Sequence, residues 1–316
     1  MSRLDPQTPK EHYVAPIETT SVQVDVVRID EKPSNLWLDA WRDLRARPLF
    51  WVSAAFVLLV IIVALFPGLF TTVEPNNGCV LAKSNAGPES GHILGFTRQG
   101  CDVYSRMIWG TRTSVVVGVL ATLISTILGM AMGAFAGFYG GWLDSLLSRI
   151  GDIFFTIPYI IAAIVVMSVI PNRNELVLAF AIGGFAWAGT ARIMRAEVLR
   201  VKQADFVMGA EAVGLSRFKT LITHVLPNAM APVIVVATLS LAGAIVAESV
   251  LSFLGVGLGG STMSWGNDIS QAQTNIRTAP MALFWPSLAL TLTVLAFITL
   301  GELLRDAVDP KARAQR

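Results

Sequence analysis

The chain has 316 residues, of which 53% are hydrophobic and only 15% are charged, and its mean hydropathy is +0.60. Soluble domains carry about a quarter charged residues, so this composition excludes an ordinary soluble protein and favours one that crosses a membrane several times. The formal net charge is +2, and no Cys/His cluster has the spacing of a zinc site. We therefore expect no metal site. The net charge by itself says little, and the expected partners of this chain do not include a nucleic acid.

The first 33 residues are polar and have no early apolar core, which predicts a flexible cytoplasmic tail and no signal peptide. Residues 34–47 differ, because Ser34 can cap a helix and apolar residues follow at helical spacing. Those apolar residues are Leu36, Trp37, Ala40, Trp41 and Leu44. Tryptophan and arginine together suit an amphipathic helix in the headgroup layer; the alternative is a simple cytoplasmic extension of the first span.

Six apolar stretches are long enough to be membrane-spanning helices, since a bilayer core needs about 20 apolar residues. They are 49–65, 114–138, 150–170, 176–191, 229–253 and 282–303. Residues 48–112 then hold the first span and a long external loop. Residues 113–316 hold a core of five spans, with a cytoplasmic loop over 202–227.

Arginine and lysine predict the orientation, because cytoplasmic loops are enriched in them. With six spans, most of these residues gather on one side. They are Arg42, Arg45, Arg47, Arg149, Arg192, Arg195, Arg200, Lys202, Arg217, Lys219, Arg305, Lys311, Arg313 and Arg316. That side is therefore expected to be cytoplasmic and to hold both termini.

The cytoplasmic loop 202–227 has the pattern of a short helix, a tight turn and a second helix. Gly214 is expected to stop the first helix, because glycine accepts the left-handed geometry of a helix end. Small residues at Gly209, Ala210 and Ala212 leave a shallow face, and Phe206 is placed to fill a groove in a partner. The alternative reading is an ordinary cytoplasmic loop.

This loop resembles the coupling loop of ABC importer permeases, with Gly214, Leu226 and Pro227 at matching positions. Further segments resemble the dipeptide and oligopeptide (peptide/nickel) permease family. They are 92–95, 100–106, 110–114, 139–144, 252–255, 264–266 and 304–310. In this order they point to the C-type membrane subunit of that family. The sequence departs from the family at Met208, which replaces its glutamate, at Gly209, which replaces an alanine, and at Cys101, which replaces an arginine.

The resemblance implies an all-α, polytopic, type I ABC importer permease in a bacterial cytoplasmic membrane. It implies a heterodimer with a second permease, two cytoplasmic ATPase subunits that bind ATP and Mg, and an external substrate-binding protein. The residues expected to contact the ATPases are Asp205, Phe206, Met208, Gly209, Ala210, Glu211, Gly214, Leu215 and Ser216. Transport of di- or oligopeptides by alternating access is the expected function, with the loop around Gly214 moving as a rigid body.

The chain itself contains no Gly-x-x-x-x-Gly-Lys-Ser/Thr loop, so we expect no nucleotide site and no enzymatic activity. Nickel or another small solute is the alternative substrate. A stand-alone secondary transporter would show internal repeats with broken helices at matching positions, and the sequence shows no convincing repeat. An intramembrane enzyme would need paired catalytic groups within the spans.

Two carboxylates lie within the predicted spans, where such groups are rare. Glu248 is expected either to line the translocation path or to be hydrogen-bonded at a helix contact near the outer surface. Asp152 is open to the same two readings, with Arg149 as its expected partner. Gly118, Gly129, Gly133 and Gly137 form a small-residue stripe in the second span. Close helix packing is their expected role, ahead of a role in the pore.

The only two cysteines, Cys79 and Cys101, lie in the predicted external loop. Disulfides persist in oxidising external compartments, and an even number of cysteines there favours pairing. We expect a disulfide that firms a platform for the binding protein; the alternative is two reduced thiols.

Overall fold

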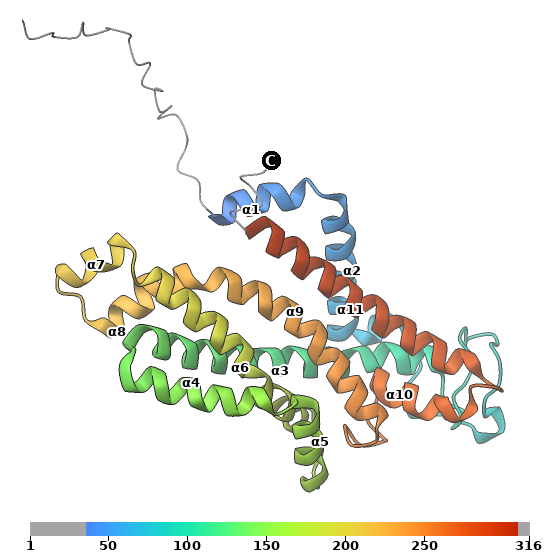
Figure 1. The fold of residues 1–316 in the computed structure, drawn as a ribbon. Helices are drawn as coiled ribbons and strands as arrows, with labels where there is room; N and C mark the ends of the chain where they lie inside the picture. The colour runs from blue at the N-terminus through green and yellow to red at the C-terminus, as the bar shows by residue number, and fades with distance from the viewer. Residues whose placement is uncertain (1–35, 309–316) are drawn as a thin grey trace, which may run out of the picture. The chain divides into compact units, whose positions relative to one another are not determined.

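A computed structural model describes residues 36–308, and every regular element among them is helical (Figure 1). The predicted tail 1–33 and Ser34 lie outside the described residues. In chain order the elements are α1 (Leu36–Arg45), α2 (Pro48–Leu65), η1 (Pro67–Leu69), η2 (Leu81–Lys83), α3 (Val103–Tyr139), α4 (Gly141–Thr156), α5 (Tyr159–Val169), α6 (Glu175–Val201), α7 (Asp205–Ala212), α8 (Arg217–Thr220), η3 (Leu221–Val225), α9 (Leu226–Phe253), α10 (Trp265–Ala272), η4 (Gln273–Asn275) and α11 (Pro280–Val308). The predicted all-α class is confirmed.

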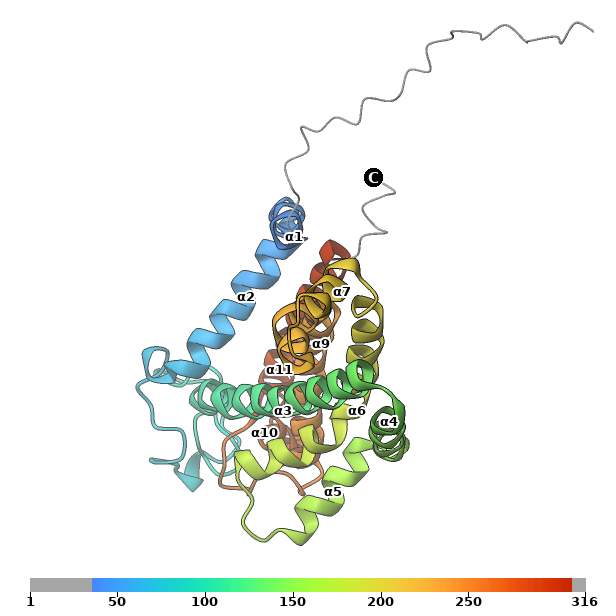
Figure 2. The ribbon, with the colours of Figure 1, turned by 90° about the vertical axis from the view of Figure 1, so that its left-hand side faces the viewer.

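Five helical segments of the described chain are long and apolar enough to cross a membrane. They are α2, α3, α6, the continuous run of α8, η3 and α9 over Arg217–Phe253, and α11. The pair α4 and α5 makes a sixth candidate span, bent by 81° at its break (Figure 2). Counting this bent pair as one span gives the six that the sequence predicts.

The prediction of one unbroken helix over 150–170 was wrong. The helix ends at Thr156, and Ile157 adopts an extended conformation with φ −86° and ψ 117°. The cause is Pro158, which has no N–H to continue the ladder and forces the residue before it out of the helical region. The first half also starts earlier, at Gly141, so Arg149 lies within α4 and not in a connecting loop.

The second span likewise begins before its predicted start at 114. Asp102 caps α3, since its carboxylate accepts the N–H of Ser105 at 2.7 Å, and the helix then runs unbroken for 37 residues. The fourth span continues as far as Val201, well past its predicted end at 191. In both cases polar residues extend a helix beyond the apolar stretch that hydropathy detects.

α3 and α6 lie side by side in parallel, and glycines allow their backbones to meet. A Cβ at Gly129 would lie 2.6 Å from the Cβ of Thr190, and one at Gly133 would lie 2.3 Å from the carbonyl oxygen of Ala191. No side chain fits at such distances. The predicted packing role of the small-residue stripe is confirmed.

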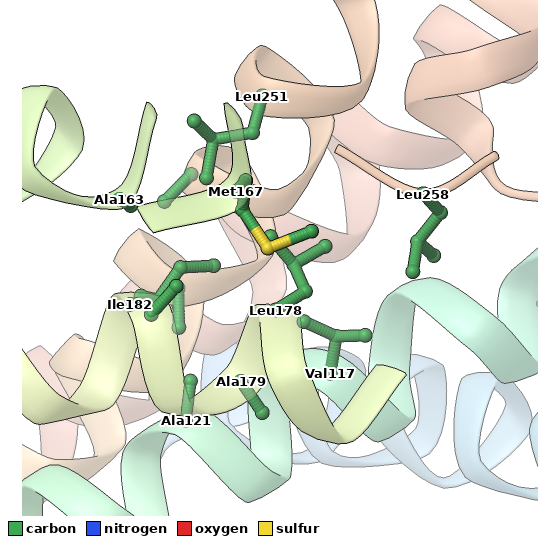
Figure 3. Packing of buried hydrophobic residues seen from close by; sticks show 12 residues of the cluster. Val117, Ala121, Ala163, Met167, Leu178, Ala179, Ile182, Leu251 and Leu258 are labelled. Carbon is green, nitrogen blue, oxygen red and sulfur yellow. The ribbon is translucent and has the colours of Figure 1, made fainter. Parts of the chain in front are cut away.

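The main apolar core lies where α3, α5, α6 and α9 meet (Figure 3). Met167, Leu178 and Leu251 are completely buried there, and Ile182 is almost so. This core holds the second half of the broken span, α5, against the long helices.

α1 lies beside the end of α11, and its apolar residues serve two surfaces. Ala40 and Leu44 are buried against a cluster that includes Leu303 and Ala307. Trp37 and Trp41 remain 43% and 48% exposed. The helix therefore forms, while its place in the headgroup layer stays a prediction.

Candidate functional site

The segment between α6 and α9 folds into a short helical hairpin, α7 and α8, joined by a tight turn. Gly214 has φ +92°, its N–H donates to the carbonyl of Glu211 at 3.0 Å, and the N–H of Leu215 donates to the carbonyl of Ala210 at 3.2 Å. These two bonds form a Schellman-type helix end that needs a left-handed residue. The predicted helix stop at Gly214 is confirmed.

Ser216 begins the second arm of the hairpin. Its hydroxyl accepts the N–H of Lys219 at 3.4 Å, which caps α8. Val207 in α7 is 1% exposed and packs in a cluster with Leu221 and Val225, so a buried anchor holds the hairpin to the ends of the long helices. The turn is therefore a defined structure rather than a loose connection.

Four large apolar side chains of this hairpin remain exposed. Phe206 is 49% exposed, Met208 55%, Val213 83% and Phe218 57%. The sequence prediction included Phe206 and Met208 but missed Val213 and Phe218, although both are apolar residues beside a predicted turn. Apolar side chains exposed together on one surface are a feature of protein-binding sites.

The polar and small members of the predicted set occupy the same hairpin. Asp205 and Glu211 are exposed, and neither forms an ion pair with another residue of the described part of the chain. A Cβ at Gly209 would have no atom within 4 Å. The chain's own packing therefore does not require a glycine there, and the open face is available to a partner.

Ion pairs join α4 to α6. Arg195 binds Asp144 through two nitrogens at 2.5 and 2.7 Å. Asp152 accepts a hydrogen bond from Arg192 at 2.9 Å, while its predicted partner Arg149 lies farther away at 3.7 Å. The structure thus gives Asp152 the predicted partner and a closer one on a neighbouring helix.

Glu248 is completely buried among hydroxyl groups. Its carboxylate accepts hydrogen bonds from Ser114 at 2.9 Å and Ser252 at 2.9 Å, and Ser249 lies 3.3 Å away. The Ser114 hydroxyl also accepts the N–H of Trp265, so the cluster joins α3, α9 and the start of α10. This geometry supports a structural role for Glu248 at a helix contact.

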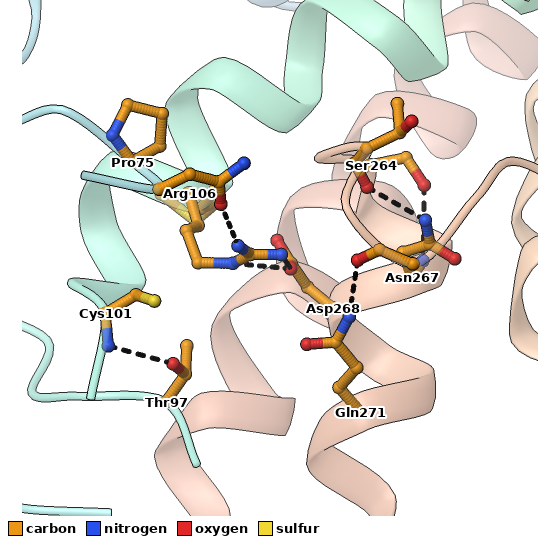
Figure 4. Close-up of polar contacts among 12 residues, drawn as sticks. Pro75, Thr97, Cys101, Arg106, Ser264, Asn267, Asp268 and Gln271 are labelled. Carbon is orange, nitrogen blue, oxygen red and sulfur yellow. Dashed lines mark hydrogen bonds and ion pairs between the residues drawn. The ribbon is translucent and has the colours of Figure 1, made fainter. Parts of the chain in front are cut away.

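The long segment between α2 and α3 is folded against α10 (Figure 4). Arg106, only 4% exposed, donates to one carboxylate oxygen of Asp268 at 2.9 and 2.5 Å and to the side-chain oxygen of Asn76. Burial raises the pKa of the Asp268 carboxyl above its ordinary value, and the Arg106 guanidinium opposes that rise. We call residues 66–106 and α10, which this pair joins, the outer lobe.

Within the outer lobe, Cys79 and Cys101 form a disulfide with their Cα atoms 4.3 Å apart. The sequence prediction of a bond between them matches this arrangement. The ion pair of Arg106 and Asp268 was missed, since 162 residues separate the two and no local pattern links them.

The sequence of this chain matches the models of known protein families. Residues 129–314 match the family model of the binding-protein-dependent transport system inner membrane component. The chain belongs to this family. Residues 35–88 of the permease also match the N-terminal TM domain of oligopeptide transport permease C. The expected type I ABC importer permease fold is confirmed.

Curated relatives are similar in sequence to this permease over most of its length. It is 38% identical over 278 residues, 88% of this chain and 91% of the relative, to the glutathione transport system permease protein GsiD of Shigella flexneri serotype 5b (strain 8401). It is 36% identical, with the same coverage, to the GsiD proteins of Escherichia coli O6:K15:H31 (strain 536 / UPEC) and Escherichia coli O157:H7.

Membership of the family fixes the general role of the chain. It is a multi-pass membrane subunit of an ABC importer, and it transports rather than catalyses a reaction. Partner ATPases and a substrate-binding protein follow from that role in general terms.

Proposed function

We propose that this permease imports peptides, from dipeptides to oligopeptides, across a bacterial cytoplasmic membrane by alternating access. The observation that carries the proposal is the match of residues 35–88 to the N-terminal TM domain of oligopeptide transport permease C. Relatives named for transport of glutathione, which is itself a small peptide, support the same solute class.

The α7–α8 hairpin is the proposed docking site for the cytoplasmic ATPases, which bind the ATP and Mg. Its exposed apolar side chains, led by Phe206 and Met208, fit a hydrophobic groove on such a partner. The rigid turn at Gly214 lets the hairpin move as one piece when the ATPases close. Asp205, Glu211, Leu215 and Ser216 belong to the same proposed contact.

A second, different permease is the proposed partner within the membrane, and the outer lobe is the proposed platform for the external binding protein. The disulfide of Cys79 and Cys101 and the buried pair of Arg106 and Asp268 give that lobe a fixed shape. Both termini of the chain are then cytoplasmic.

The decisive experiment is purification of the native complex and its reconstitution in proteoliposomes with its binding protein. ATP-dependent uptake of labelled dialanine, a labelled pentapeptide or labelled glutathione is the expected result, and Ni²⁺ should not be transported. Uptake of Ni²⁺ without uptake of any peptide would overturn the peptide assignment in favour of the nickel alternative.

The orientation is tested separately with accessibility tags. Tags at positions 20 and 310 should be reached only from the cytoplasm, and a tag at Asn85 only from outside. A cytoplasmic tag at position 85 would contradict the proposed six-span arrangement.

A further inference from the structure

A hollow of about 340 Å³ lies beside the break between α4 and α5. Four spans contribute to its wall, because it is lined by residues of α3, of the α4–α5 break, of α6 and of α9. The lining includes Thr122, Pro158, Tyr159, Gly189, Ser240 and Gly243. None of the residues that line it is charged. We call this hollow the bend groove.

The break itself leaves backbone groups without partners inside their own helices. The first N–H groups of a helix and its last carbonyls make no intrahelical bonds, and no side chain caps the start of α5 at Pro158. Ile157 is 39% exposed in this chain. In a membrane, irregular backbone is tolerated only where protein buries it or where it lines a water-filled cavity.

The depth of the break follows from its neighbours. Thr122 lies near the middle of α3, Gly189 near the middle of α6 and Ser240 near the middle of α9. The free N–H groups at the start of α5 are therefore level with the centre of three long spans. Lipid contact at this depth would leave them unsatisfied.

Two glycines keep the bend groove open without serving the packing of this chain. A Cβ at Gly189 or at Gly243 would have no atom within 4 Å, whereas one at Gly133 would collide with backbone. Among the described residues, the hydroxyls of Tyr159 and Ser240, which line the hollow, form no hydrogen bond. The bend groove therefore has both open space and hydroxyl groups that are free to form hydrogen bonds.

We infer that the bend groove is the wall that this subunit contributes to the translocation path, and that it binds the amide and carboxylate groups of a passing peptide. This inference rests on the proposed function. A hydroxyl can accept a hydrogen bond from the N–H of a peptide amide or donate one to its carbonyl. The free N–H groups at the start of α5 can donate to a carbonyl or carboxylate oxygen. An uncharged wall of this kind accepts peptides of different side chains, because it contacts what all of them share.

The groove continues towards the charged cluster of α4 and α6. A second hollow of about 340 Å³ shares Ala188 with it and is lined by Asp152, Arg192 and Arg195. Asp152 therefore lines a hollow next to the bend groove, whereas Glu248 lines neither of the two.

The test uses a single cysteine in the groove. Both native cysteines are held in the disulfide, so Gly243→Cys provides one reactive thiol, and Ile127→Cys, exposed on α3 outside the groove, is the matched control. The complete complex is treated with a water-soluble cationic methanethiosulfonate, with and without ATP and vanadate. Uptake of dialanine, a pentapeptide and glutathione is then measured.

We expect Gly243→Cys to react at rates that differ severalfold between the two nucleotide states, and its adduct to abolish uptake while the complex stays assembled. Ile127→Cys should label equally in both states, and its labelling should not change uptake. Equal labelling of Gly243→Cys in both states with normal uptake would overturn the inference. So would a thiol that reacts only in the isolated subunit, because the second permease would then cover the groove. If the unlabelled complex imports no peptide at all, the proposed function fails, and the labelling pattern still reports on the groove.

A milder variant tests the hydrogen-bonding role. Tyr159→Phe keeps the ring and removes only the hydroxyl, so the yield of complex should not change. The KM for peptide uptake should rise about fivefold, the value of one neutral hydrogen bond. An unchanged KM for Tyr159→Phe and also for Ser240→Ala would contradict solute binding at these hydroxyls.

Discussion

The contact between α3 and α6 and the α7–α8 hairpin both depend on glycines, but for opposite reasons. In the contact, Gly129 and Gly133 are surrounded, and a Cβ on either would meet a neighbour within 2.6 Å. In the hairpin, Gly209 and Gly214 have empty space around them, and Gly214 is needed only for its positive φ. The first set is required by close packing between two helices. In the second, Gly214 is required by the turn, and Gly209 leaves an open face at the proposed ATPase contact.

The strongest way to break this comparison is to fill the α3–α6 contact. Gly133→Val would place a side chain against the carbonyl oxygen of Ala191, 2.3 Å from the new Cβ, and backbone cannot rotate away. We expect a loss of about 3 kcal/mol in the free energy of unfolding, at the upper end of what overpacking costs. The monodisperse yield in detergent and the thermal unfolding temperature measure it.

Gly184→Ala in α6 is the matched control, because a Cβ there meets nothing within 4 Å. Its stability should equal or slightly exceed that of the parent chain. Equal yields of Gly133→Val and Gly184→Ala would show that the two sets of glycines do not differ as described.

The second prediction concerns Gly214. Valine disfavours the left-handed conformation at φ +92°, so Gly214→Val should distort the hairpin while leaving the membrane helices intact. We expect a well-folded subunit whose complex hydrolyses ATP without peptide uptake, or fails to hold its ATPases. Proteoliposome assays of both activities decide this.

Gly214→Asn is the control for the second prediction, since asparagine tolerates the left-handed region. It should keep most of the coupling between hydrolysis and uptake. Normal substrate-stimulated hydrolysis and uptake in Gly214→Val would remove this turn from the coupling mechanism.

A smaller effect is expected at a single exposed side chain of the hairpin. Phe206→Ala should weaken binding of the ATPases about tenfold, as loss of an aromatic anchor at an interface does. Co-purification at graded salt and detergent concentrations measures it. Trp142→Ala, which removes a 76% exposed aromatic from α4, should have no effect on ATPase binding; equal loss in both variants would rule out a specific contact.

The last prediction concerns the outer lobe, where the effect should be local and should leave the membrane helices unchanged. Replacing Cys79 and Cys101 by serine removes a cross-link worth about 3 kcal/mol in the chain-entropy model. We expect faster hydrogen exchange confined to 80–100 and weaker binding of the external binding protein. Mass spectrometry of unreduced parent protein should recover the linked peptide pair, and two freely alkylated thiols would contradict the bond.

Local chemistry explains how much of this molecule could be predicted from its sequence. The apolar stretches located the spans, and Gly214 identified the helix end, because each depends on residues close together in the chain. Pro158 carried a readable signal as well, since proline inside a 21-residue apolar stretch marks a break. Hydropathy alone cannot register it, because the residues on both sides are equally apolar.

Contacts between segments that are distant in the sequence could not be predicted from local patterns. Arg106 meets Asp268 across a sequence separation of 162 residues, and Ala40 and Leu44 are buried because α11 ends beside α1. The bend groove belongs to the same class, because its wall combines residues from four spans. A single sequence gives the chemical character of these side chains but not which of them share a space.

The continuous run from Arg217 to Phe253 has a mechanical consequence. At 1.5 Å per residue its 37 residues reach about 55 Å, so it is a lever arm that begins in the hairpin and ends beside the outer lobe. Ser240 and Gly243 of the bend groove lie in this run, between its two ends. Its far end is joined to α3, because Glu248 accepts a hydrogen bond from Ser114, and Ser114 in turn accepts the N–H of Trp265 at the start of α10. If the hairpin docks the ATPases as proposed, a push on it is expected to pivot the run about this joint and to move the wall of the bend groove with it.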